Sequence, residues 1–307
     1  MRWSICIPQF VDDDGAFDPE ALRGYIVRAE AAGFESAWTV EQVIGPASIL
    51  SPLETMTYAA ACVERIRLGC AVLVTPLHNP VHLAKSLGSL DQLSRGRLDV
   101  GVAIGGGGRM FSAFGVDPDD GLVARFNEGL RLMKALWTEP KVTFDGRFWQ
   151  LDGAVMEPKP VQRPHPPIWF GGRAPAAVRR AVRHGDGFFG AGSTTTADFA
   201  DQVALVRREL DEQGRDSGGF GIAKRVYLAV DDDAERARGQ VAAGLVRLYG
   251  DFGRTLEPVA VAGTPDDCAR GLRAVADAGA EMILLHPLSD QAAQMERLLA
   301  EVMPAVP

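Results

Sequence analysis

The chain has 307 residues, of which 47% are hydrophobic and 23% charged, a composition typical of a globular protein with a large core. The formal net charge of -8 argues against binding to nucleic acid or to an anionic membrane, because both need clustered basic side chains. No uncharged apolar stretch approaches the ~20 residues that span a bilayer, and the first residues lack the features of a signal peptide, so we expect a cytoplasmic protein.

The first half of the chain alternates short apolar runs with longer amphipathic stretches, which is the pattern of βαβ units in a parallel sheet. Pro19 lies in the first turn of a helix predicted to begin at Asp18, and Gly33 follows its end, as helix start and stop signals require. The strands predicted in this half are 2–8, 36–40, 66–74 and 98–103, and the further helices begin at Ser51-Pro52, at about Pro80 and at about Leu122.

The second half repeats this alternation after one interruption. Residues 142–151 show β alternation around Asp145-Gly146, a dipeptide that favours a hairpin turn, so we expect a short β-hairpin excursion from the main sheet. Predicted strands follow at 167–171, 187–190, 222–230 and 282–286, with helices at 196–213, in the segment that ends near Tyr249, and from Pro265.

The predicted segments make eight strands with helices between most of them, and no linker marks a domain boundary. An α/β barrel typically needs ~250 residues, so we predict a single (β/α)8 TIM barrel domain over residues 1–307. Periodicity alone also fits a doubly wound open sheet, and that alternative stays open at this point.

Cysteine and histidine spacing gives no support for a metal site. The cysteines are scattered, have no CxxC pair and are expected to be free thiols: Cys6, Cys62, Cys70 and Cys268. His78 and His82 have the i, i+4 spacing of a metal pair, but neither a Glu-x-x-His motif nor a third ligand accompanies them. We therefore predict no bound metal.

Three glycine-containing loops follow predicted strands, at the barrel end where (β/α)8 enzymes carry their active sites. They cover residues 105–109, 171–173 and 190–194. Glycine lets a backbone approach a flat ring or a phosphate closely, and Arg173 adds a cation before a predicted helix. Each loop alone fits a flexible turn, but three at one barrel end favour a cofactor pocket. The chain lacks a G-x-G-x-x-G fingerprint in its first βαβ unit and a GxxxxGK[ST] loop, which argues against a Rossmann nicotinamide site and against ATP hydrolysis.

Four polar residues at strand ends are candidates for catalysis: Glu41, Gln42, His78 and His286. A carboxylate at the position of Glu41 suits acid–base chemistry or the orientation of a partner, and a salt bridge with an arginine such as Arg97 is the alternative. A serine hydrolase needs a G-x-S-x-G elbow, which the sequence lacks.

Several blocks of the chain resemble the luciferase-like monooxygenase superfamily, in that family's order. They include AAGFESAWTVEQ, the long run from SPLETMTYAAACVERIRLGC to GRLDVGVAIGG, RFNEGLRLMKALWTEPKVTFDGRFWQL, PKPVQRPHPPIWFGGR and GDGFFGAG. The blocks cover about two-thirds of the chain and are most similar to the branch that uses the deazaflavin coenzyme F420. Users of flavin mononucleotide (FMN) share them.

This resemblance implies a cofactor ring across the barrel mouth, backed by a bulge in the third strand with a non-prolyl cis peptide at Ala71-Val72. It places the ring beside Gly105, Gly106 and Gly107. It places the side chain or phosphate of the cofactor at Gly171, Gly172 and Arg173, and its tail at Gly190, Ala191 and Gly192. Family members often form homodimers, which we expect here too.

Two positions depart from the deazaflavin pattern. Many deazaflavin members have a histidine where this chain has Gln42, and glutamine does not shuttle protons at neutral pH. The sugar-phosphate dehydrogenases place a glutamate where this chain has Gly106, so we do not expect glucose-6-phosphate oxidation by that acid–base pair. His78 or His286 would then take over, or the reaction needs no strong protein base.

The leading hypothesis is an oxidoreductase that transfers a hydride between coenzyme F420 and a small organic substrate, with the cofactor supplying the chemistry and the barrel placing it. The alternatives are an FMN-dependent monooxygenase that uses dioxygen and a separate reductase, and a barrel that binds cofactor without catalysis. The substrate is not readable from the sequence, because the loops after Gln42, at 110–120 and at 251–258 match no known pattern.

Overall fold

The computed structural model describes residues 1–11, 15–106 and 111–306. Eight strands form a closed parallel barrel, because each strand pairs with the next and the last pairs with the first. Closure confirms the predicted TIM barrel and excludes the open sheet. In ring order the strands are β1 (Arg2–Cys6), β2 (Ser36–Thr39), β3 (Arg67–Cys70) continued by β4 (Leu73–Val74), β5 (Leu98–Ala103), β8 (Ile168–Gly171), β9 (Gly187–Gly190), β10 (Gly221–Val230) and β12 (Met282–Pro287).

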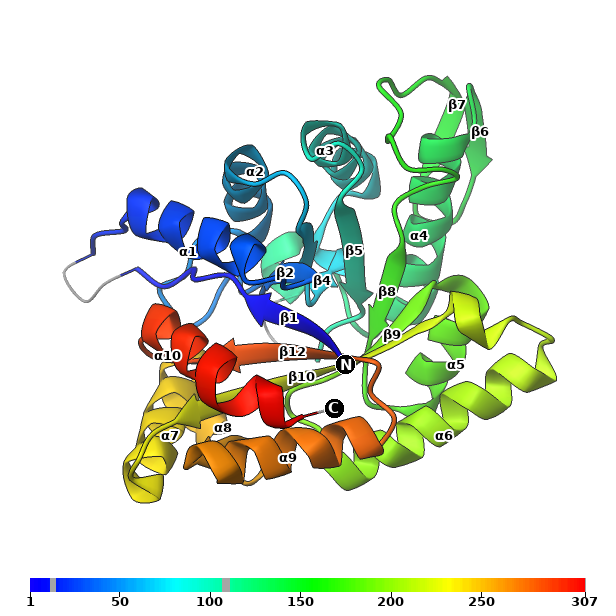
Figure 1. Cartoon of the computed structure of the whole chain (residues 1–307). Coiled ribbons are helices and arrows are strands. Elements are labelled where there is room, and N and C mark those ends of the chain that lie inside the picture. The colour runs from blue at the N-terminus through cyan, green and yellow to red at the C-terminus, as the bar shows by residue number, and fades with distance from the viewer. Residues whose placement is uncertain (12–14, 107–110, 307) are drawn as a thin grey trace.

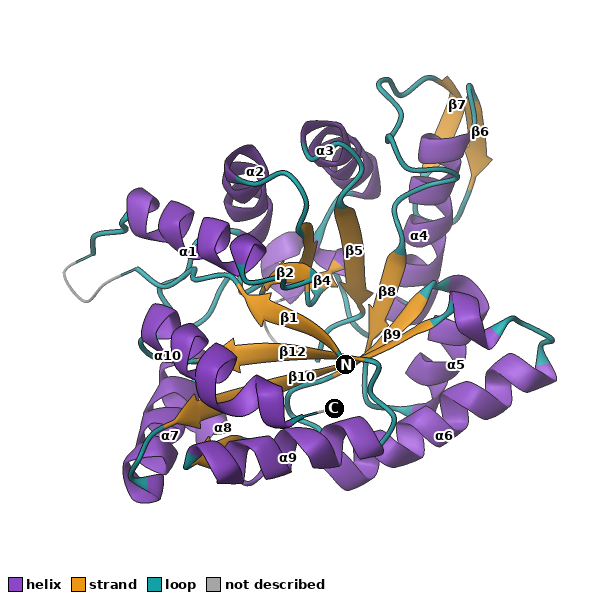
Figure 2. Cartoon of the chain, in the orientation of Figure 1, coloured by secondary structure: helices purple, strands orange, loops and turns teal. Residues whose placement is uncertain are grey.

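Helices surround this barrel on its outside (Figure 1), and the view coloured by secondary structure shows the strands enclosed by them (Figure 2). Most begin at a capping side chain or a proline, as helix starts require. The helices are α1 (Pro19–Ala31), α2 (Pro52–Cys62), α3 (Pro80–Leu93), α4 (Leu122–Thr138), α5 (Pro175–His184), α6 (Thr196–Glu212), α7 (Ala234–Tyr249), α8 (Asp251–Arg254), α9 (Pro265–Asp277) and α10 (Gln291–Arg297).

The expected hairpin excursion is present as the antiparallel pair β6 (Val142–Asp145) and β7 (Gln150–Ala154), which stands beside α4 in Figure 1. The buried carboxylate of Glu128 on α4 accepts hydrogen bonds from the backbone N–H groups of Arg147, Phe148 and Trp149. Glu128 therefore ties the hairpin turn to the barrel.

One predicted strand needs correction, and one short strand was missed. The strand predicted at 66–74 is broken into β3 and β4 by residues 71 and 72, which are joined by a cis peptide bond as the family resemblance implied. Gly101 on β5 makes room for this bulge, because a Cβ atom there would lie 1.9 Å from the carbonyl oxygen of Cys70. The short strand β11 (Val261–Gly263), which pairs with the outer part of β10, was not predicted at all.

The interior of the barrel is filled by aromatic and apolar side chains. Trp38 is fully buried and meets Phe189 edge to face, with ring centroids 4.9 Å apart. Trp169 packs against both rings, and Gly187 and Gly221 provide the space for its indole. The barrel centre is therefore a packed core rather than a channel, which leaves the strand ends for function.

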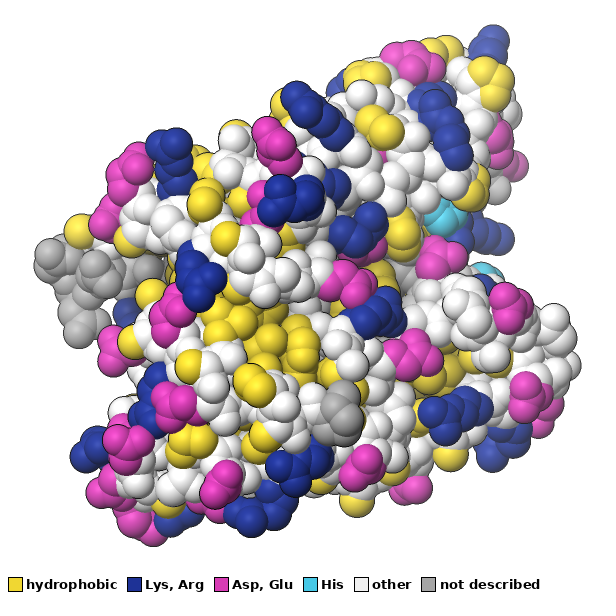
Figure 3. Space-filling view, viewed as in Figure 1, with side chains coloured by type: hydrophobic (Ala, Val, Ile, Leu, Met, Phe, Trp, Pro, Cys, Tyr) yellow, Lys and Arg dark blue, Asp and Glu magenta, His cyan; other side chains and the backbone are white. Residues whose placement is uncertain are grey.

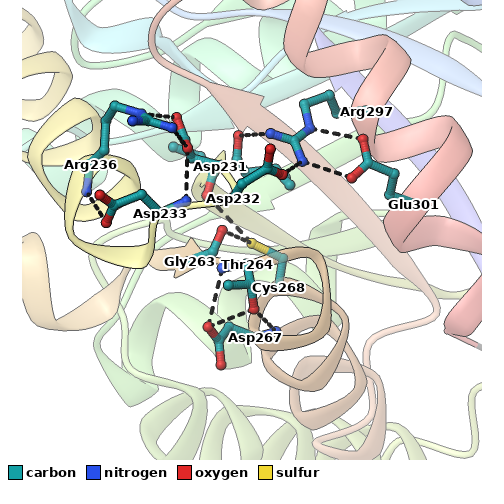
Figure 4. A network of polar contacts seen from close by, with 12 residues as sticks. Asp231, Asp232, Asp233, Arg236, Gly263, Thr264, Asp267, Cys268, Arg297 and Glu301 are labelled. Carbon is teal, nitrogen blue, oxygen red and sulfur yellow. Dashed lines mark hydrogen bonds and ion pairs between the residues drawn. The ribbon is translucent and has the colours of Figure 1, made fainter.

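Beyond the carboxyl end of β10, Arg236 of α7 and Arg297 of α10 each bind a carboxylate of the loop at 231–233, and the Cys268 thiol of α9 contacts the carbonyl of Ala229 (Figure 4). Arg297 donates to Asp232 over 2.6 Å and to Glu301 over 2.7 Å. Thr264 and Asp267 form a capping box at the start of α9, in which each side chain accepts a hydrogen bond from the backbone N–H of the other residue. These contacts fix the last two helices on the barrel.

We expect Thr264→Ala to lower the free energy of unfolding by about 1 kcal/mol, because the substitution removes the side-chain acceptor for an otherwise unpaired backbone N–H. Urea unfolding followed by circular dichroism measures this change. Thr264→Ser, which keeps the acceptor, is the matched control and is expected to retain most of the stability. Equal losses in both variants would contradict a capping role.

Charges of both signs are intermingled over the face drawn in Figure 3, around a smaller apolar area near its centre. Among the described residues, no helix combines the length and the apolar character that a membrane crossing requires. The same part of the chain contains no group of three or more His, Cys, Asp or Glu side chains that could hold a metal ion, and its four cysteines are unpaired thiols.

Candidate functional site

A cavity of about 470 Å³ opens at the carboxyl ends of the strands, and we call it the glycine-lined cavity. Apolar side chains such as Phe126, Phe170 and Phe189 form much of its wall, and Arg180 and Arg225 add positive charge. Nine of the residues predicted to bind a cofactor line it: Ala71, Val72, Gly105, Gly106, Gly171, Gly172, Arg173, Gly190 and Ala191.

Glycine is required at some of these positions for space and at others for backbone conformation. Gly105 has a φ of +88°, and a Cβ atom there would lie 2.6 Å from the side chain of Val74. A Cβ on Gly190 would lie 2.5 Å from the ring of Phe199. At Gly106, in contrast, a Cβ would meet no atom within 4 Å, so this residue borders open space.

The other two predicted cofactor residues are not placed in this wall. Gly192 packs under Tyr227, whose ring a Cβ atom would approach to 2.6 Å, and it does not line the cavity. Gly107 lies outside the described residues.

A second cavity of about 310 Å³ adjoins the first, and we call it the arginine–tyrosine cavity. Arg225, Tyr227 and Tyr249 form its polar wall, and Leu248 and Leu256 contribute apolar surface. It shares five lining residues with the glycine-lined cavity, namely Ala71, Val72, Gly106, Ser193 and Arg225. A molecule in each cavity would therefore lie side by side at the cis peptide.

Glu41 and His78, predicted separately, lie together. One carboxylate oxygen of Glu41 lies 2.7 Å from Nε2 of His78, and the other accepts the backbone N–H of Val74 over 2.6 Å. The Glu41 side chain is only 2% exposed, whereas that of His78 is 24% exposed. The alternative salt bridge between Glu41 and Arg97 is wrong, because the Arg97 guanidinium donates instead to backbone carbonyls, including that of Ile66.

The structure assigns different surroundings to the other two predicted polar residues. The amide nitrogen of Gln42 donates to the carbonyl of Leu248, and its oxygen accepts the N–H of Ala47, so its amide fastens the loop after β2 to α7. His286 is buried beneath Tyr227 and lines neither cavity. Burial, followed by the charge of Arg225, lowers the pKa of His286 well below its usual range, so its ring is neutral at neutral pH.

Sequence reasoning missed Arg225, Tyr227 and Tyr249. Arg225 donates to the carbonyl oxygen of Ala71 over 3.1 Å, to the Tyr227 hydroxyl over 2.8 Å and to the Tyr249 hydroxyl over 3.1 Å. One signal was available in the sequence: Lys224 and Arg225 interrupt an otherwise apolar strand, and central strands of a parallel sheet are normally apolar throughout.

A third hollow of about 350 Å³, the outer cavity, continues from the glycine-lined cavity past Arg173 and Ser193, which line both. It lies against α5 and the start of α6. Within the described part of the chain, two buried polar atoms on its wall have no hydrogen-bond partner, Oγ1 of Thr194 and Oε1 of Gln202. Buried polar atoms normally have partners, so these atoms suit a polar ligand group or water.

Lys224 holds the loop after β9 by a hydrogen bond to a backbone carbonyl. Its ammonium donates to the carbonyl of Ala191 over 2.6 Å and to that of Arg225 over 3.1 Å. The residue is only 2% exposed. Burial, followed by the charge of Arg225, lowers the pKa of Lys224 from 10.5 to about 7. The protonation state of Lys224 thus changes near neutral pH.

This shift predicts a pH dependence of stability. Between about pH 7 and about pH 10.5 Lys224 binds more protons in the unfolded state than in the folded state, so this residue contributes a rise with pH to the free energy of unfolding across this window. We expect Lys224→Met to flatten this rise, and Lys141→Met, at an exposed lysine, to preserve it. Urea unfolding at several pH values within the window measures both slopes. Identical slopes in wild type and Lys224→Met would exclude the buried lysine as their source.

Residues 1–282 of the chain match the family model described as luciferase-like monooxygenase. An F420-dependent glucose-6-phosphate dehydrogenase of Kineococcus radiotolerans is 27% identical over 320 residues, which cover 94% of this chain and 93% of that protein. An FMNH(2)-dependent dimethylsulfone monooxygenase of Pseudomonas putida is 30% identical over 238 residues, which cover 76% of this chain and 64% of that protein, less than two thirds of its length. The crystal structure of monooxygenase RslO1 from Streptomyces bottropensis superimposes with a TM-score of 0.84 at 27% identity, covering 99% of both chains.

Proposed function

Because the chain belongs to the luciferase-like monooxygenase family, we propose that it is an oxidoreductase that transfers a hydride between coenzyme F420 and a small organic substrate. The observation that carries this proposal is the contact between the glycine-lined cavity and the arginine–tyrosine cavity at Ala71 and Val72. A flat cofactor ring in the first cavity and a substrate in the second would then meet at the shared wall, and such positioning is what hydride transfer mainly requires.

The residues of the glycine-lined cavity fit a flavin-type cofactor. Small residues at 105, 106 and 171 leave room for a ring, since a Cβ on Gly171 would lie 3.0 Å from Val72 and one on Gly106 would project into space. Arg173 and the unpartnered Thr194 hydroxyl suit a phosphate near the start of α6. When bound, F420 would supply the hydride chemistry, and the chain would supply its placement.

Glu41 and His78 are the residues that we assign to proton handling. Glu41 contributes the single carboxylate among the described residues that line the arginine–tyrosine cavity. Its hydrogen bond to the partly exposed His78 connects the cavity wall with solvent. Gln42, at the position where many deazaflavin members have histidine, holds the loop that carries Glu41 instead of moving a proton.

Three observations bear on the choice of cofactor. F420 carries an extended tail beyond its phosphate, and the outer cavity provides space there; the F420-dependent relative also aligns almost end to end. The carboxylates of Asp198 and Asp201 on the wall of the outer cavity are unfavourable for an anionic tail and favour FMN, which ends at its phosphate. An FMN-dependent monooxygenase is therefore the second candidate function.

Fluorescence titration of the purified apoprotein with F420 and, in parallel, with FMN tests the proposal. Binding of F420 at micromolar or lower concentration, without comparable FMN binding, would support hydride transfer. Tight binding of FMN alone would overturn the cofactor choice and would lead to oxygen-consumption assays, because deazaflavins react poorly with dioxygen. Binding of neither cofactor would overturn both candidate functions.

A further inference from the structure

The Arg225 guanidinium is a half-buried cation at the junction of the two cavities. It lines both of them and is bound to one backbone carbonyl and two phenol hydroxyls. Among the described residues, no carboxylate forms an ion pair with it, and its side-chain partners are the hydroxyls of Tyr227 and Tyr249. A charge withdrawn from bulk water in a cavity wall is normally paired, so Arg225 lacks a counter-ion that a ligand can provide.

Hydrogen-bond counting at this cluster leads to the same requirement. Arginine has five N–H donors and no acceptor, and three donors are used by Ala71, Tyr227 and Tyr249. The two phenol oxygens lie 2.6 Å apart, so one hydroxyl donates to the other and the second hydroxyl hydrogen remains available. The cluster thus offers surplus donors to the cavity and needs an acceptor from the ligand.

The remaining wall of the arginine–tyrosine cavity is mostly apolar. Val40, Val74, Leu248 and Leu256 line it, and Phe252 lies at its border. Both oxygens of Glu41, the acidic group in this wall, are already hydrogen-bonded to Val74 and His78. A ligand with an apolar body and one anionic end therefore matches Arg225, the two phenols and the apolar part of the wall.

We propose that the substrate is a small organic acid, whose carboxylate binds Arg225 and Tyr249 while its apolar body lies against the aliphatic wall. The inference rests on the proposed function, because that function makes this cavity the substrate site. It adds the chemical class of the substrate and assigns Arg225 the role of its anchor.

Benzoate and its uncharged analogue benzamide are the probes for this proposal, because they share a ring and differ in charge. Isothermal titration of each probe into the protein, with and without cofactor, measures the preference for charge. We expect wild type to bind benzoate at least ~30-fold more tightly than benzamide, the gain typical of a charge-assisted hydrogen bond pair. Equal affinities, or no binding of benzoate at millimolar concentration, would overturn the proposal.

Substitutions at Arg225 and Tyr249 test whether these residues cause the preference for benzoate over benzamide. Arg225→Gln is expected to bring the two affinities within about 3-fold of each other, and Tyr249→Phe to weaken benzoate binding by about 3- to 10-fold. Tyr249→Phe keeps the ring and the Arg225 contact to Ala71, so it remains informative if Arg225→Gln fails to fold. Tyr58→Phe, at an exposed hydroxyl on α2, is the matched control and is expected to bind like wild type. An unchanged charge preference in Tyr249→Phe and in any folded Arg225 variant would overturn the assignment.

Separate cofactor titrations on the same proteins distinguish failure of this inference from failure of the proposed function. Cofactor binding without a preference for benzoate would overturn the organic-acid inference and leave the proposed function standing. A preference for benzoate that depends on Arg225, without binding of F420 or FMN, would overturn the proposed function and leave an organic-acid site.

Discussion

Gly106→Leu is expected to weaken the binding of F420 or FMN by at least about 100-fold while leaving the fold intact, because a leucine here projects into the binding space instead of into the protein. A Cβ at this position meets no atom within 4 Å, and Gly106 lines both the glycine-lined cavity and the arginine–tyrosine cavity. The added side chain would therefore occupy the volume where the cofactor ring and the substrate meet.

Fluorescence titration measures the loss of affinity, and thermal unfolding verifies that the variant is folded. Gly239→Leu is the matched control, because Gly239 lies on α7 and a Cβ there also meets no atom within 4 Å. It is expected to bind cofactor like wild type. Undiminished affinity in a folded Gly106→Leu protein would place the cofactor elsewhere.

Trp38→Ala is expected to lower the free energy of unfolding by about 3–5 kcal/mol, the usual cost of removing a large aromatic side chain from a core. Trp38 is 0% exposed at the centre of the barrel and contacts the rings of Phe189 and Trp169. Its indole N–H also donates to the Ser36 hydroxyl over 2.8 Å. The substitution therefore removes packing on several strands at once.

Urea unfolding at neutral pH measures this loss. Leu93→Ala is the control, because Leu93 is 63% exposed. It is expected to change the free energy of unfolding by less than about 0.5 kcal/mol. Because Phe189 also lines the glycine-lined cavity, a milder Trp38→Phe variant is expected to bind cofactor more weakly while remaining folded. A decrease in the free energy of unfolding below about 1 kcal/mol in Trp38→Ala would contradict the prediction. It would show that neighbouring side chains fill the cavity left by the indole.

Much of the barrel was predictable because the eight ring strands and most of the long helices have local sequence patterns. Apolar runs bounded by glycine and proline gave all eight ring strands, and the Asp145-Gly146 turn gave the hairpin. The break between β3 and β4 was not predictable from periodicity, since it depends on Gly101 on the neighbouring strand. β11 has only three residues and its pairing with β10 is a tertiary contact, so it leaves no pattern in the sequence.

The candidate site was predictable to the extent that it consists of loops at one barrel end. Glycine positions such as 105 and 171 follow from their place after a strand. The pairing of Glu41 with His78 did not follow, because it joins loops after two different strands. Tyr249 was also beyond sequence reasoning, since it lies at the end of α7 and its place in the cavity wall beside Arg225 is a tertiary contact.

The bond between Arg225 and the carbonyl of Ala71 has a consequence for the energetics of binding. Ala71 belongs to the wall of both cavities, so a ligand that engages the Arg225 guanidinium alters a contact that also shapes the cofactor side. If a ligand changes this contact, occupancy of one cavity would change affinity for the other, and thermodynamic linkage would require the effect to be equal in both directions. Under the proposed function, dissociation constants for cofactor and substrate would then be comparable only when the state of the second cavity is specified.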